Sequence, residues 1–120
     1  MTDEVWVKEL DESVLHPVEG IQGEYHRFIQ PTRENGGLIG ALGRLLPGQN
    51  TGYHEHPESE VFFVLRGHGE ARWKVGEEEH IAELHPGVAF YKVGGISHQM
   101  INTGGEPLLG FVAKVLNQEQ

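Results

Sequence analysis

The sequence contains no cysteine. This absence excludes disulfide scaffolds, thiolate zinc sites, iron–sulfur clusters and cysteine nucleophiles, and it favours a reducing, cytoplasmic location. Long hydrophobic runs are also absent, because no stretch approaches the roughly 20 apolar residues that a membrane-spanning helix requires. The acidic first residues lack the basic region of a signal peptide. We therefore expect no membrane anchor.

Basic residues are scarce, with nine Lys and Arg against 18 Asp and Glu and a net charge of −9. Repulsion from phosphate excludes nucleic acid as the main partner. A chain of 120 residues has room for one domain. Its 17 glycines, six prolines and 38% hydrophobic residues are typical of a turn-rich globular protein.

Apolar residues recur with period two between frequent turn residues, and no segment has the pattern of an amphipathic helix. Ten short strands are predicted, which indicates an all-β barrel or sandwich. The expected strands cover residues 4–9, 21–29, 37–46, 51–56, 60–66, 69–75, 79–84, 88–93, 97–103 and 107–116.

We expect one domain over residues 1–120, with N-terminal strands in 1–36 and a barrel in 37–116. The N-terminal strands carry more apolar side chains than a barrel of about eight strands needs for closure. The loop from Pro31 to Gly37 is long enough to let them reach a neighbouring subunit. The sequence therefore predicts a homodimer in which these strands could be exchanged.

One residue type is in excess, because the chain has eight histidines. His54 and His56 would point to the same face of an extended segment, and Glu60 would head the next strand after the turn at Pro57. A divalent cation would compensate a buried carboxylate that faces two imidazoles. A solvated acidic loop with incidental histidines is the alternative.

Two spaced motifs extend this pattern. The first is Gly48, His54, His56, Glu60 and Gly67, and the second is Gly87, Val93, Gly95, His98 and Asn102. In these residues and intervals the chain resembles the cupin superfamily over about residues 37–116. Nine of the ten marked positions match, and Val93 stands where the family usually has proline.

The resemblance implies a small jelly-roll β-barrel (the double-stranded β-helix) with four metal ligands, His54, His56, Glu60 and His98. Imidazole and carboxylate ligands suit Mn, Fe, Co, Ni, Zn or Cu as divalent ions, so we expect one such ion per chain. Four protein ligands on an octahedral ion would leave two positions for substrate, water or dioxygen.

Further residues are candidates for the substrate pocket. The aromatic, methionine and amide candidates are Tyr53, Phe62, Tyr91, Met100, Asn102 and Phe111, and His26 is a further candidate near the barrel mouth. Core packing is the alternative for the aromatic and methionine side chains. Arg44 and Lys114 lie in otherwise apolar strands, and either one inside the barrel would mark a carboxylate-binding site, whereas on the outer face it would be a solvated charge.

Two functions fit these features. The first is a metal-dependent enzyme of dioxygenase, isomerase or lyase type that acts on a small polar, anionic or chelating substrate. The second is a non-catalytic module that binds a small molecule or a metal chelate. A sensor normally needs an output domain, and the chain shows no helix-turn-helix motif, no basic face and no spare length for one. The sequence therefore favours the enzyme over the binding module.

Overall fold

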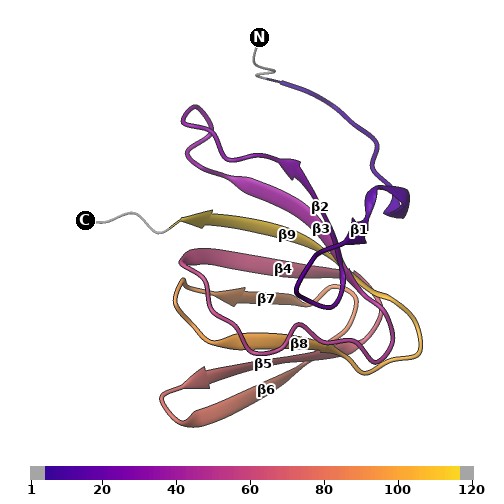
Figure 1. The fold of residues 1–120 in the computed structure, drawn as a ribbon, viewed down its shortest axis with the longest axis vertical. Coiled ribbons are helices and arrows are strands. Elements are labelled where there is room, and N and C mark those ends of the chain that lie inside the picture. The colour runs from indigo at the N-terminus through magenta and orange to yellow at the C-terminus, as the bar shows by residue number, and fades with distance from the viewer. Residues whose placement is uncertain (1–4, 117–120) are drawn as a thin grey trace.

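Short antiparallel strands dominate the computed structural model, which describes residues 5–116 (Figure 1). A single 3₁₀ turn, η1 (Glu12–Val14), precedes the first strand. The described strands are β1 (His16–Pro17), β2 (Glu24–Ile29), β3 (Ile39–Leu45), β4 (Glu58–Arg66), β5 (Gly69–Val75), β6 (Glu78–Leu84), β7 (Ala89–Lys92), β8 (His98–Asn102) and β9 (Leu108–Leu116).

The strands form two antiparallel sheets. The larger sheet has the order β1-β2-β3-β9-β4-β7, and the smaller one has the order β6-β5-β8. The neighbours β3 and β9, and β9 and β4, are far apart in sequence, so long-range pairing closes the structure (Figure 1). This arrangement is a small jelly-roll barrel, and the expected all-β fold is confirmed.

The hydrophobic core lies between the inner faces of the sheets. Every second side chain of a strand points inward, so one apolar set is buried and the other faces outward. The buried core cluster takes residues from both sheets: Ala41, Leu45, Phe62, Val64, Ala71, Leu84, Leu108 and Val112.

Two expected strands are not formed. Residues 5–9, the described part of the expected strand 4–9, have no regular structure, and Val5 and Val7 are exposed. Residue 4 lies outside the described residues. The expected strand 51–56 is an irregular segment with one isolated bridge, between His54 and His98. A strand requires continuous backbone pairing, and in the second segment Gly52, at φ 69°, interrupts the extended backbone.

The strand expected over residues 21–29 begins later, at Glu24, and pairs with β3 of the same chain. Beyond it, β1 forms the edge of the larger sheet. The N-terminal segment then crosses the outer face of this sheet, where the Trp6 ring lies 6.2 Å from the Phe28 ring.

Candidate metal centre

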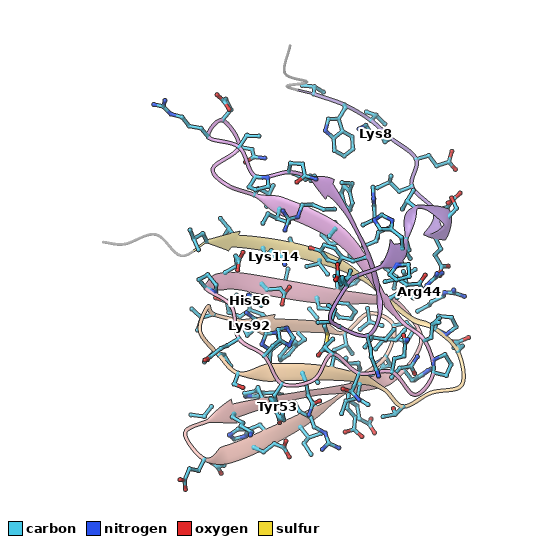
Figure 2. The ribbon with its side chains drawn as sticks, in the orientation of Figure 1. Lys8, Arg44, Tyr53, His56, Lys92 and Lys114 are labelled. Carbon is cyan, nitrogen blue, oxygen red and sulfur yellow. The ribbon has the colours of Figure 1, made fainter. Side chains whose placement is uncertain are left out.

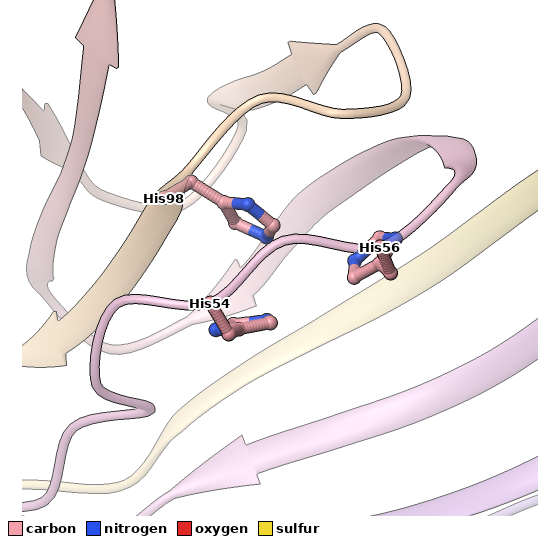
Figure 3. Close-up of side chains that lie close together, drawn as sticks. All are labelled: His54, His56 and His98. Atoms are coloured by element: carbon pink, nitrogen blue, oxygen red, sulfur yellow. The ribbon is translucent and has the colours of Figure 1, made fainter.

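Three imidazoles meet beside the inner face of the barrel (Figure 3). His54 and His56 lie on the irregular segment before β4, and His98 is the first residue of β8. The segment is fixed to β8 by two backbone hydrogen bonds of 3.0 Å, from the His54 N–H to the His98 carbonyl and from the His98 N–H to the His54 carbonyl. One ring nitrogen from each of the three histidines lies within 4.8 Å of the others.

Backbone carbonyls orient two of the rings. The Nδ1 of His54 lies 2.9 Å from the Gly52 oxygen, and the Nδ1 of His98 lies 2.9 Å from the Ile96 oxygen. Because a carbonyl can only accept a hydrogen bond, each Nδ1 carries a proton, and in the neutral ring Nε2 then holds the lone pair. A carbonyl partner of this kind is typical of histidines that ligate metals through Nε2.

His98 gives the strongest indication of a missing partner. Its side chain is 1% exposed, and its buried Nε2 has no hydrogen-bond partner among residues 5–116. An unpaired buried nitrogen is costly, and a cation held by three neutral imidazoles would remove the cost. The residues present therefore fit a borderline divalent metal ion.

Glu60 lies beside this group on β4. Its Oε1 is 3.5 Å from Nε2 of His56 and 3.7 Å from Nε2 of His98. Burial raises the pKa of Glu60, but the neighbouring His98, His56, Lys114 and Lys92 more than offset this effect, so the pKa lies below 4.5. The carboxylate is therefore ionised at neutral pH.

Lys92 is a site residue that the sequence reasoning missed. It ends β7, is only 5% exposed, and donates a 3.0 Å hydrogen bond from Nζ to the Glu58 carbonyl (Figure 2). Its Nζ also lies 3.2 Å from Nδ1 of His56. Burial lowers the pKa of Lys92. The signal that could have found it is strand register, because Lys92 pairs with the inward-facing Glu60.

The Nδ1 of His56 also lies 3.3 Å from a Glu58 carboxylate oxygen. With a proton on Nδ1 directed at that carboxylate, Nε2, the nitrogen nearer to Glu60, is free as a lone-pair donor; in the other tautomer Nδ1 accepts from the Lys92 ammonium and Nε2 carries the proton. Burial lowers the pKa of His56, which favours the neutral form that a metal requires.

A cavity of about 280 Å³ adjoins the imidazoles. All four expected ligands line it. Of the expected pocket residues, Phe62 and Met100 are in its wall. Its other walls are mainly apolar and include Val18, Ile21, Tyr25, Leu45, Leu108 and Val112.

The other five pocket candidates lie elsewhere. The Tyr53 hydroxyl bonds to Glu79 at the β5–β6 hairpin, and Tyr91 is 67% exposed, because its position in β7 points outward. Asn102 is buried, but its amide donates to the carbonyls of Leu45 and Glu106. It therefore links the end of β3 to the loop before β9.

Phe111 and His26 face the outer side of the larger sheet. The Phe111 ring packs 5.8 Å from the Phe28 ring, and the His26 ring lies 6.1 Å from the His16 ring. Alternation along a strand gives two faces but does not say which of them is inside.

The fold and the histidine group define the class of small jelly-roll proteins with a candidate metal centre. Residues 41–113 match the cupin domain model, which is more than half of the chain, so the chain belongs to the cupin domain family. A comparison with curated proteins finds no match.

Solved structures share the fold over nearly the whole chain. A Cupin 2 conserved barrel domain protein from Salinispora arenicola is 20% identical with a TM-score of 0.72, over 94% of this chain and 90% of that one. A predicted oxalate decarboxylase from Thermotoga maritima is 19% identical with a TM-score of 0.75, over 92% and 100%. A protein from Thermus thermophilus is 27% identical with a TM-score of 0.70, over 93% and 98%.

Within residues 5–116, no helix is long and apolar enough to cross a membrane.

Proposed function

We propose that this chain is a metal-dependent enzyme that binds one divalent ion through His54, His56, His98 and Glu60 and acts on a small anionic or chelating substrate. The observation that carries the proposal is the buried, unpartnered Nε2 of His98, which lies in a group with two further imidazoles beside a cavity. Membership of the cupin domain family supports the same reading.

A bound divalent ion would supply Lewis-acid chemistry, or dioxygen activation if it is iron. The chain's own residues prepare the site. Carbonyl partners hold the tautomers of His54 and His98, and the ionised Glu60 contributes negative charge. The mainly apolar cavity wall would limit the contact of water with a bound substrate. These features support chemistry of the dioxygenase, isomerase or lyase type.

Metal analysis of protein purified without chelators or nickel resin tests the site. We expect His56→Ala to remove most of the bound metal, because loss of one ligand lowers affinity steeply. His68→Ala is the matched control, since His68 is exposed and lies outside the cavity lining. Equal metal content in the wild type and in the His56 variant would contradict the assignment.

Turnover is tested on the metal-loaded protein. Oxygen uptake and product formation would be followed with catechols, diketones and keto acids, and with oxalate because of the predicted oxalate decarboxylase among the structures of like fold. Metal binding without turnover of any of these compounds would favour a non-catalytic module that binds a small molecule or a metal chelate.

We further propose that the chain acts as a homodimer. Exposed apolar side chains on the outer face of the larger sheet support this proposal.

A further inference from the structure

Lys114 is a cation in the cavity wall without a partner of opposite charge in direct contact. It lies on β9 opposite Glu60 of β4, and both side chains line the cavity. Within residues 5–116, no carboxylate oxygen lies within 4.0 Å of its ammonium group. In the proposed function Glu60 serves the metal ion, and Glu24, the other carboxylate in the wall, is paired with Arg44.

Arg44, the other basic residue in the apolar strands, is fully engaged. It donates hydrogen bonds of 3.0 and 2.8 Å to the Glu24 carboxylate and one of 3.0 Å to Glu12. Both residues line the cavity, but Arg44 lies toward the opposite end of the β3–β9 pair from Lys114 (Figure 2). Of the two basic residues, Lys114 is therefore the one available to a ligand.

Tyr25 places a second donor in the same wall. The Lys114 ammonium lies 5.5 Å from the centre of the Tyr25 ring. The Tyr25 hydroxyl oxygen is buried and has no hydrogen-bond partner in the described part of the chain. A buried hydroxyl without an acceptor is costly, and an oxygen anion seated beside Lys114 would supply that acceptor.

The other residues of the cavity wall determine the polarity of the remainder of the ligand. Phe62, Met100, Leu108 and Val112 offer apolar contact. The polar side chains of this wall are engaged within the protein: Gln22 accepts from the Asn50 N–H, Thr51 accepts from the Met100 N–H, and Glu24 pairs with Arg44. The volume of about 280 Å³ is below the roughly 300–1,000 Å³ of pockets for drug-sized ligands. The cavity thus suits a small molecule that has one anionic end and an apolar body.

We propose that Lys114 and Tyr25 form an anion subsite, which binds the carboxylate of a small organic acid whose alkyl or aryl body packs against Phe62 and Met100. This inference rests on the proposed function, because it takes Glu60 as a metal ligand. It narrows the substrate class from small anions in general to monocarboxylates with an apolar body.

The test is binding of hexanoate and of its uncharged analogue hexanamide to the full chain, measured by calorimetry or NMR titration. We expect the wild type to prefer hexanoate by about tenfold or more, which is the effect of a charge-assisted hydrogen bond. Lys114→Met keeps most of the aliphatic stem and should abolish this preference, and Lys114→Arg should retain part of it. Tyr25→Phe keeps the ring and should weaken hexanoate binding several-fold.

Lys74→Met is the matched control, because Lys74 is exposed and its ammonium lies over the Tyr53 ring, outside the cavity. It should leave hexanoate binding unchanged. Failure of the wild type to bind hexanoate, or equal preference in the wild type and Lys114→Met, would overturn the subsite. Thermal unfolding of each variant verifies that it is folded.

Metal content, measured on the same samples, separates the two proposals. Lys114-dependent hexanoate binding in a protein that takes up no metal would leave the subsite standing and reject the metal centre. Metal uptake with no effect of Lys114→Met on hexanoate binding would support the metal centre and reject the subsite.

Discussion

The ring of Phe62 packs against the backbone of Gly110, and this contact shapes the floor of the cavity. A Cβ at Gly110 would lie 2.7 Å from Cε2 of Phe62 and closer still to two other ring carbons. Phe62 is 4% exposed, so the ring has little room to move. Position 110 is therefore restricted to glycine by packing.

We expect Gly110→Ala to destabilise the protein by about 1–3 kcal/mol, the usual cost of overpacking a core. Gly43→Ala is the control, because a Cβ there would meet its neighbours at ordinary distances of 3.8 and 3.9 Å. Urea unfolding measures both changes. Equal stability of the two variants would show that the Phe62 ring yields without cost.

At the level of single residues, the sequence predicted the histidine group but not the residues around it. His54, His56 and His98 stand at motif spacings, so their convergence could be predicted from the resemblance. The burial of Lys92 depends on the register of β7 against β4, which no local pattern contains. The prediction that Tyr91 lies in the pocket differs from its exposed position for the same reason, because a strand read in the wrong parity exchanges its two faces.

At the scale of elements, turns were predicted better than strand partners. The motif glycines all adopt φ between 82° and 93°, a region that other residues rarely occupy: Gly48, Gly67, Gly87 and Gly95. Motif spacing therefore records where the chain must turn. It does not record which segments pair continuously: residues 5–9 stay irregular, and residues 51–56 make one isolated bridge to β8 and contain Gly52 at φ 69°.

A charge network fastens η1 to the barrel. Glu12 accepts hydrogen bonds from Arg44 at 3.0 Å and from Arg66 at 2.7 Å, and so links the N-terminal segment to β3 and β4. Burial raises the pKa of Glu12, but the two arginines outweigh it and the pKa lies below 4.5. The folded state thus favours the ionised carboxylate.

We expect Glu12→Gln to reduce the free energy of unfolding at pH 7 by about 0.5–1 kcal/mol, as for partly exposed ion pairs. Because the folded-state pKa is depressed, the stabilisation is present above pH 4.5 and is lost as the pH falls through the folded-state value. Urea unfolding at pH 7 and pH 3 should therefore show a smaller difference between wild type and variant at pH 3 than at pH 7.

Glu19→Gln is the control for this experiment, since Glu19 is exposed and makes no ion pair within the described residues. A difference of equal size at both pH values would contradict an electrostatic role for Glu12.

At the scale of the whole molecule, the outer face of the larger sheet presents an apolar groove. Leu38, Val61, Tyr91 and Val115 line it, and Leu38, Tyr91 and Val115 are exposed by 40, 67 and 38%. The N-terminal segment covers Phe28 elsewhere on this face but does not line the groove. Apolar surface of this kind favours burial against a partner.

A second copy of the chain is the partner that we propose, because a two-fold axis would cover both grooves with one self-complementary contact. The net charge of −9 opposes this association, so the apolar contact must overcome repulsion between the copies. Salt screens that repulsion and leaves the apolar contact intact. The dimer should therefore become tighter as ionic strength rises.

Sedimentation at micromolar concentration should give twice the chain mass of 13.4 kDa, with a monomer fraction that falls between low and moderate salt. Tyr91→Glu should shift the protein toward monomer, because it places a charge in the buried contact. Ile81→Glu is the matched control, since Ile81 is 54% exposed on β6 of the smaller sheet, away from the groove. A mass near 13.4 kDa at all salt concentrations would reject the dimer. An equal effect of both substitutions would show that the dimer interface does not lie at this groove.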